Sequence, residues 1–419
     1  MAAQDVHRAI DAVWRIESAR LIAGLTRVAG DVGAAEDLAQ DALVAAIEQW
    51  PRSGIPDSPG AWLMTTAKRR GIDALRRSAT LARKQEQIAR ERQLLERLHE
   101  PHPAERVEHI DDDVLRLVFM TCHPTLPREG RVALTLRLLG GLSTPEIARA
   151  FLVSQGTVAQ RIVRAKRTLA AARVPFELPS AQERLQRMSA VLEVVYLIFN
   201  EGYSASAGES WTRPSLCAQA LRLGRMLAAL MPREREVHGL LALMELQASR
   251  LRARVGAGGE AVALAEQNRA RWDHLLVRRG LASLARAQAL GGPLEPYTLQ
   301  AEIAACHARA SDVEHTDWQR IVALYDALVA LTGSPVVELN RAVAVTMAYG
   351  PAAGLELVHA LAEEPALRGS HLLHAVHGDI LARLERTREA REQFQRAAEL
   401  CENARERELL RSRARSCVA

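Results

Sequence analysis

Apolar residues recur every three or four positions along almost the whole chain, which is the spacing of one buried face on a helix. The first such pattern covers residues 5–29, and the second covers 33–50 and is expected to end at Pro51. No stretch alternates apolar and polar residues convincingly enough to predict a strand. The pattern predicts an all-α protein, with further helices in this part of the chain at residues 59–77, 112–123 and 127–140.

Two short helices joined by a tight break are expected within residues 143–169. Ser143 and Glu146 form a capping box, and Ser154 caps the second helix. Helical spacing turns one apolar row of the second helix inward: Val158, Ile162, Ala165 and Leu169. The opposite face carries Thr157, Gln160, Arg161, Arg164 and Arg167. This pattern fits a helix-turn-helix, whose second helix enters the major groove of DNA.

Local charge favours this DNA-binding interpretation. The chain as a whole is only mildly basic, with a formal net charge of +5. Between Arg128 and Arg173, however, the chain has nine basic and two acidic residues. Nine minus two leaves an excess of seven positive charges, which suits binding to phosphates. The alternative is an ordinary amphipathic hairpin with a solvated charged face, and it stays open at this point.

Composition excludes several other classes of protein. Hydrophobic residues make up 48% of the chain and aromatic residues only 4%, as in packed helices. No apolar run is long enough to cross a bilayer, and the N-terminus has no signal-peptide pattern. The five cysteines lie far apart with no CxxC motif, which indicates a reduced, cytoplasmic protein: Cys122, Cys217, Cys306, Cys401 and Cys417.

No sequence motif points to an enzyme or a cofactor. The chain has no phosphate-binding loop, no GxSxG and no dinucleotide fingerprint. His371, His374 and His377 share one predicted helix, but a residue six positions on lies round the helix from the first. We therefore predict no metal site from this trio and no cofactor.

The second half of the chain is expected to be helical throughout. Residues 80–98 are charged and predicted to continue a helix, 99–111 form a proline- and acid-rich linker, and VPFELPS follows Arg173 as a second linker. Two helix pairs repeat with an offset of some 36 residues, close to the tetratricopeptide period; the small residues that match are Ala344 with Gly378 and Gly354 with Ala390. A generic helical bundle is the alternative. The predicted helices are about 180–200, 214–230, 233–250, 258–291, 296–310, 317–332, 335–349, 351–362, 370–384 and 387–402.

Three segments carry a family resemblance. Residues 31–50 and 61–77 resemble region 2 of bacterial sigma factors, and 126–170 resemble region 4. With no long region 3 between them, the chain is similar to extracytoplasmic-function (ECF) sigma factors that have a C-terminal tetratricopeptide-like extension. The resemblance implies region 2 at 1–98, region 4 at 112–174 and a C-terminal helical domain at 180–419, with repeats near 317–402.

The resemblance also implies roles for individual residues. Region 4 would read the −35 promoter element with Gln155, Thr157, Gln160, Arg161 and Arg164. It would contact the DNA backbone there with Arg137, Lys166 and Arg167. Region 2 would hold the −10 element with Trp62, Lys68, Arg69, Arg70, Arg76 and Arg77, and would place a flipped base near loop 51–60. Many family members have Asn where this chain has Arg69, which favours a phosphate contact there. Core RNA polymerase would dock on Glu36, Asp37, Gln40 and Asp41, although their spacing alone favours a solvated helix face.

We therefore expect a non-enzymatic sigma factor that binds core RNA polymerase and promoter DNA and helps open the duplex, with its C-terminal domain regulating it in cis. A separate regulatory protein is a further candidate partner. The first alternative is a helix-turn-helix regulator that binds operators without polymerase and uses the tail as a sensor. The second is a helical scaffold whose basic hairpin is fortuitous.

Overall fold

The computed structural model describes residues 3–81, 107–151, 153–205, 209–256, 258 and 260–417. Within these ranges every regular element is a helix, apart from one isolated bridge between Val255 and Ala261. The prediction of an all-α protein is confirmed. The chain forms two compact units, Met1–Val195 and Tyr196–Ala419, and each is described by itself. None of the helices in the described ranges is long and apolar enough to span a membrane.

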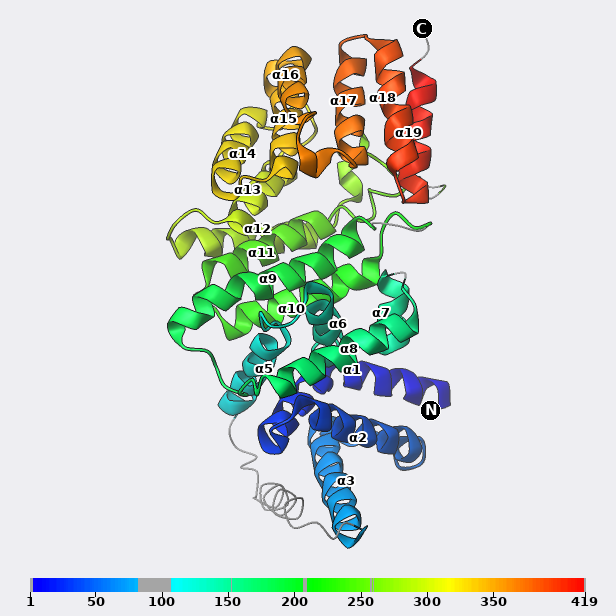
Figure 1. The fold of residues 1–419 in the computed structure, drawn as a ribbon, viewed down its shortest axis with the longest axis vertical. Coiled ribbons are helices and arrows are strands. Elements are labelled where there is room, and N and C mark those ends of the chain that lie inside the picture. The colour runs from blue at the N-terminus through cyan, green and yellow to red at the C-terminus, as the bar shows by residue number, and fades with distance from the viewer. Residues whose placement is uncertain are drawn as a thin grey trace. The chain divides into compact units, whose positions relative to one another are not determined.

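The first unit is built around its N-terminal helix. α1 (Ala3–Ala29) packs against four other helices: α2 (Val32–Ser53), α3 (Pro59–Leu81), α5 (Val107–Thr121) and α6 (Arg128–Leu138). Ile22 and Leu25 of α1, Trp50 of α2 and Leu63 of α3 are all almost fully buried. α7 (Thr144–Phe151) and α8 (Gln155–Ala171) pack on each other and on α6. The two predicted DNA-binding regions therefore share one compact unit (Figure 1).

The second unit is a succession of helices in which neighbours along the chain pack side by side (Figure 1). α9 (Ala181–Tyr203) crosses the division between the units, and α11 contacts both α12 and α13. The other helices of this unit are α10 (Pro214–Leu230), α11 (Arg235–Ala248), α12 (His274–Ala289), α13 (Pro296–Arg309), α14 (Trp318–Thr332), α15 (Pro335–Tyr349), α16 (Pro351–Leu361), α17 (His371–Arg383), α18 (Thr387–Leu400) and α19 (Ala404–Ser416).

The small residues of the predicted repeat lie where helices approach closely. A Cβ atom on Gly378 of α17 would come within 3.0 Å of the Phe394 ring on α18. A Cβ atom on Gly354 of α16 would clash with the Thr346 hydroxyl on α15. Ala390 is fully buried at the start of α18. Small side chains are therefore required by packing in both the α15–α16 and the α17–α18 pair.

Two boundaries differ from the sequence prediction. α2 does not end at Pro51 but runs on to Ser53, because proline removes only one amide from a final turn that Gly54 then closes with φ +83°. The single helix predicted over 258–291 is wrong: it begins only at His274, where the Asp273 side chain accepts the amides of Leu275 and Leu276. Two short 3₁₀ turns precede it, Leu264–Glu266 and Arg269–Arg271.

Two further differences concern segments for which no helix range had been predicted. α19 had not been predicted, although Asn403 caps its first turn. α5 begins at Val107, inside the predicted linker 99–111. The predicted helical continuation at 80–98 lies outside the described residues beyond Leu81.

Candidate functional site

The pair α7–α8 forms the predicted helix-turn-helix. Ser143 and Glu146 make the capping box: the Ser143 amide donates to Glu146 Oε2 at 2.8 Å, and the Glu146 amide donates to Ser143 Oγ at 3.4 Å. At α8 the Thr157 amide donates to Ser154 Oγ at 3.0 Å. The inward row of α8 is buried as predicted: Val158, Ile162, Ala165 and Leu169. Local capping and spacing thus fix which side of α8 meets solvent.

The outer face of α8 carries the polar residues expected to contact DNA. Gln155, Gln160, Arg164 and Arg167 are exposed, and Arg161 is half-buried. Thr157 is also half-buried, and its hydroxyl lies 2.9 Å from Ser154 Oγ, so it takes part in the helix cap. The side chain of Arg149 lies outside the described residues.

Ion pairing separates the basic residues of this unit into two groups. Arg128 and Arg131 of α6 both reach Glu193, at 3.0 and 3.6 Å. In contrast, no ion pair with a described carboxylate is found for the arginines on the outer face of α8: Arg161, Arg164 and Arg167. Unpaired, solvated guanidinium groups are free to bind phosphates or base edges without first breaking a bond within the protein.

α3 presents the residues expected to hold the −10 element. Trp62 is half-buried against Trp50, with ring centroids 5.3 Å apart in an edge-to-face arrangement, so it joins α3 to α2. Lys68 is half-buried, and burial together with the nearby Arg27 charge lowers its pKa. Arg69 is exposed, and Arg70 lies 3.6 Å from Glu48. The side chains of Arg76 and Arg77 lie outside the described residues.

The acidic and amide stripe on α2 is divided in two. Asp37 and Asp41 are exposed, as a docking surface requires. Glu36 is buried at 3% exposure, and Arg137 Nε donates to its Oε1 at 2.5 Å. Lys166 Nζ lies 2.5 Å from its Oε2, and Gln40 Nε2 donates to Oε1 at 2.6 Å. We call the group of Glu36, Arg137 and Lys166 the ion triad.

The ion triad joins α2 to both α6 and α8. Burial by itself would raise the pKa of Glu36, but hydrogen bonding and charge from Lys166 and Arg137 outweigh it, and the net pKa is lowered. Glu36 is therefore ionised at neutral pH and covered by its two cationic partners. Lys166, which was expected to contact DNA, and Arg137 are here bound to a carboxylate of the other region.

Two other ion pairs link the same two regions. Arg27 of α1 lies 3.0 Å from the buried Asp113 of α5, and Arg15 of α1 lies 3.2 Å from Glu146 of α7. At the Arg15–Glu146 pair a groove of about 420 Å³ runs between α1, α2 and the turn before α7. Its lining includes Val44 and Ile47, which are 46% and 40% exposed on α2. An exposed apolar strip thus lies along α2 next to the exposed Asp41.

Sequence reasoning missed these links. The sequence indicates no partner for Asp113, which pairs with Arg27 and with Arg116. The partners of Glu36 lie 101 and 130 positions further along the chain, and no local spacing predicts a contact at that separation.

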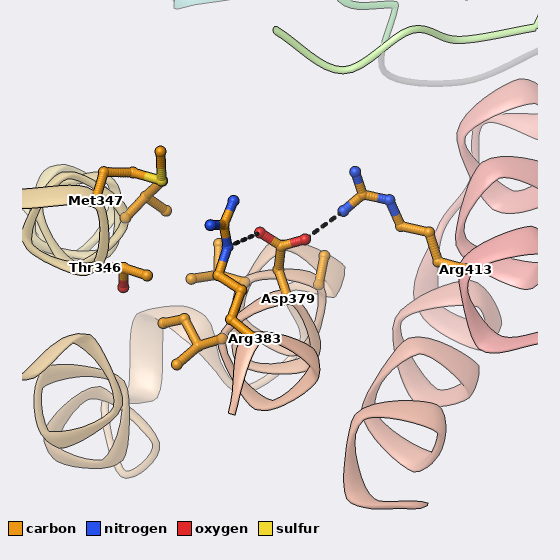
Figure 2. Close-up of a pocket in the computed structure, with 9 residues that line it drawn as sticks. Thr346, Met347, Asp379, Arg383 and Arg413 are labelled. Atoms are coloured by element: carbon orange, nitrogen blue, oxygen red, sulfur yellow. Dashed lines mark hydrogen bonds and ion pairs between the residues drawn. The ribbon is translucent and has the colours of Figure 1, made fainter. Parts of the chain in front are cut away.

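The second unit contains a pocket of about 180 Å³ between α15, α17 and α19 (Figure 2). Asp379 lies at its centre, with Arg413 Nη1 at 2.7 Å from one carboxylate oxygen and Arg383 Nε at 3.6 Å from the other. Thr346 and Met347 of α15 form the opposite wall. Arg413 also lies 3.7 Å from Glu266, so the two guanidinium groups are matched by two carboxylates and the pocket offers little unbalanced charge to a ligand.

Comparisons with known proteins support the same division of the chain. Residues 16–80 match the family model of sigma-70 region 2, and residues 116–169 match that of sigma-70 region 4. Residues 187–288 match a family of unknown function, DUF6596.

Two kinds of relative were found. The chain is 44% identical over 391 residues to an uncharacterized protein of Rhizobium meliloti (strain 1021). The matched residues make up 92% of this chain and 90% of that protein. It is 29% identical over 179 residues to the probable ECF RNA polymerase sigma factor SigI of Mycobacterium tuberculosis, which covers 43% of this chain and 60% of SigI.

Proposed function

Since the chain belongs to the ECF sigma factors, with a helical C-terminal extension, we propose that it binds core RNA polymerase and directs it to promoters with −35 and −10 elements. The proposal extends to opening of the duplex around the −10 element. The observation that carries it is the outer face of α8, where guanidinium and amide groups stand exposed and without carboxylate partners among the described residues. Such groups match the base edges of the major groove.

In this proposal α8 contacts the −35 element. Arg161 and Arg164 donate paired hydrogen bonds to guanine edges. The side-chain amides of Gln155 and Gln160 form hydrogen bonds with adenine edges. Arg167 binds phosphate, and the Thr157 hydroxyl, which takes part in the cap, positions the start of the helix. α3 binds the −10 element through Lys68, Arg69 and Arg70, with Arg76 and Arg77 further along, and Trp62 holds α3 on α2.

Polymerase docking is assigned to the outer face of α2. Asp37 and Asp41 supply the exposed charge, and the apolar strip of Val44 and Ile47 supplies area for a helix-to-helix contact. Glu36 and Gln40 join this surface only after the ion triad opens, because Arg137 and Lys166 otherwise cover Glu36. Opening of the triad would release Lys166 and Arg137 to DNA phosphates at the same time.

We further propose that the second unit regulates this activity in cis. Its size supports the proposal, since Tyr196–Ala419 is longer than the unit that carries both DNA-binding regions. α9 supports it as well, because this one helix contributes to both units. A helix shared in this way would transmit a change in one unit to the other.

The decisive experiment is run-off transcription with purified core polymerase on a pool of genomic promoters. We expect start sites that depend on this protein and share spaced −35 and −10 elements. DNA binding with no new start sites would instead favour an operator-binding regulator with a sensor tail. A chain with Arg161→Ala and Arg164→Ala serves as the matched control, because it retains the α2 face.

Truncation tests regulation by the tail. A fragment ending at residue 178 removes all of α9, together with the Glu193 partner of Arg128 and Arg131. A second fragment ending at Tyr203 keeps that helix and its ion pairs. If both fragments match the full chain in promoter output under every condition, the cis-regulatory proposal is wrong.

A further inference from the structure

Three side chains with different metal-binding atoms meet in the second unit. His371 is the first residue of α17, Cys401 follows the last residue of α18, and Glu406 lies in the first turn of α19. His371 Nε2 lies 3.2 Å from Glu406 Oε1, and the three ligand atoms all lie within 4.8 Å of one another. Among the residues that the structure describes, this is the one such group found.

The three histidines of α17 noted in the sequence, His371, His374 and His377, do not converge on one site. His374 Nδ1 lies 2.8 Å from Gln393 Oε1, and His377 packs edge-to-face on His359 with ring centroids 5.4 Å apart. His371 alone of the three faces Cys401 and Glu406. The helical repeat thus separates the histidines, and the tertiary fold supplies His371 with new neighbours.

The spacing of the three atoms suits one tetrahedral ion. Zn²⁺ binds imidazole nitrogen and carboxylate oxygen at about 2.0–2.2 Å and thiolate sulfur at about 2.3 Å. Tetrahedral angles then separate neighbouring ligand atoms by roughly 3.3–3.6 Å. The 3.2 Å between His371 and Glu406 is close to this value, and the Cys401 sulfur lies within 4.8 Å of both ligand atoms.

The alternative is a structural ion pair beside a buried thiol. One observation weighs against it. His371 Nε2 is buried without a hydrogen bond of adequate geometry, although a carboxylate oxygen lies nearby. Cys401, 2% exposed, lies beside these two groups. A cation between the three groups would satisfy the imidazole nitrogen and balance a thiolate and a carboxylate together.

Hydrogen bonds around the cluster hold its backbone in place. The Asn403 side chain, 1% exposed, accepts the amides of Arg405 and Glu406, which fixes the turn that carries Glu406. It donates to the carbonyls of Ala205 and Ser210 at 3.0 and 2.9 Å. Outer partners of this kind orient the ligands in metal sites. They also connect the cluster to a segment within the DUF6596 match.

We propose that His371, Cys401 and Glu406 form a binding site for Zn²⁺ or a similar soft divalent ion. Three protein ligands leave the fourth tetrahedral position for water or an outside ligand. The ion joins the ends of α17, α18 and α19 and stabilises their packing. The tail of this sigma factor is thereby a metal-responsive element, whichever way it acts on transcription.

Titration of the metal-free, reduced full chain with Co²⁺ and then Zn²⁺ tests the site. We expect one equivalent of Co²⁺ to give the visible absorption of a tetrahedral complex together with a thiolate-to-metal charge-transfer band, and Zn²⁺ to bleach both. Cys401→Ser should remove the charge-transfer band. His371→Gln and Glu406→Gln should each weaken binding by at least about 10-fold.

The controls are residues of the same types nearby. His374→Gln and Cys417→Ser should bind Co²⁺ like the unaltered chain, because neither side chain belongs to the cluster. Zn²⁺ should also raise the thermal midpoint of the unaltered chain but not that of His371→Gln. A chain that takes up no equivalent of Co²⁺, or whose spectrum survives all three substitutions, would overturn the proposal. Circular dichroism of each variant identifies a loss of binding caused by misfolding.

Discussion

α2 and α8 each carry a polar stripe assigned to a partner, and the two stripes differ in accessibility. Gln155, Gln160, Arg164 and Arg167 on α8 all face solvent. On α2 the stripe is split, with Asp37 and Asp41 exposed but Glu36 buried beneath Arg137 and Lys166. In the proposed function, the α8 surface can bind DNA as it stands, whereas the α2 surface would be complete only after the ion triad opens.

The difference shows what helical periodicity determines. Spacing along one helix fixes which residues point away from that helix's own packing face. It does not determine whether a helix from a distant part of the sequence packs over those residues. Glu36 satisfies the first condition and fails the second, because α6 and α8 each bring a cation to it.

The largest effect is expected on the exposed stripe. Replacing Arg161 and Arg164 with alanine should weaken binding to a −35 duplex by about 1–3 kcal/mol for each base that an arginine no longer binds, on the order of 10- to 100-fold. Fluorescence anisotropy at fixed salt measures this change. Arg187→Ala on α9 is the control, since Arg187 pairs with Glu183 on its own helix. Equal weakening in both variants would indicate a purely non-specific charge effect.

The next-largest effect is expected at Glu36, the buried part of the α2 stripe. Glu36→Gln should lower the free energy of unfolding by about 1–3 kcal/mol at pH 7, because Arg137 and Lys166 lose a buried anionic partner. Urea denaturation measures this decrease. Asp37→Asn, on the exposed side of the same helix, should change stability by less than about 0.5 kcal/mol. The comparison fails if the two variants are equally destabilised.

The loss of stability in Glu36→Gln is expected to depend on pH. The pKa of Glu36 is lowered in the folded chain, so its stabilising effect is fully present above the unfolded value of about 4.3. The effect is lost as the pH falls through the lower folded pKa. The stabilities of the unaltered chain and Glu36→Gln should therefore converge progressively as the pH falls below the unfolded value towards the lower folded pKa. A constant difference down to acidic pH would contradict the assignment.

A smaller effect is expected at the start of α8. Ser154→Ala removes the acceptor of the Thr157 amide and should cost about 1 kcal/mol of stability. DNA binding should weaken with it, since the cap positions the first residues of the DNA-facing helix. Thermal unfolding and anisotropy together test this, and Ser154→Asp, which keeps an acceptor, should restore most of the stability.

The smallest effect concerns polymerase. Asp41→Asn should weaken association with core polymerase by about 0.3–1 kcal/mol, less than 10-fold, because an exposed charge at an interface rim contributes modestly. Biolayer interferometry across a salt series measures it, with Glu48→Gln on the same helix as the control. No change at any salt concentration would remove Asp41 from the docking surface.

Sequence alone predicted the features of this protein that depend on neighbours in the chain. The caps at Ser143 and Ser154 and the buried row ending at Leu169 follow from spacing within one turn or two. The start of α12 was predicted wrongly, because a helical pattern that looks continuous runs across the break before Asp273. The partners of Glu36, Asp113 and His371 could not be predicted either, since each contact depends on how separate helices pack.

The ion triad also bears on how such chains diverge in evolution. Its three residues lie in segments that match two different family models, so a charge removed from one segment leaves an unmatched charge in the other. A chimera that takes region 4 from a relative without this arginine and lysine would inherit a stranded carboxylate at position 36. Charge reversal at Glu36 should accordingly be suppressed by a second-site reversal at Arg137, which a genetic selection would recover.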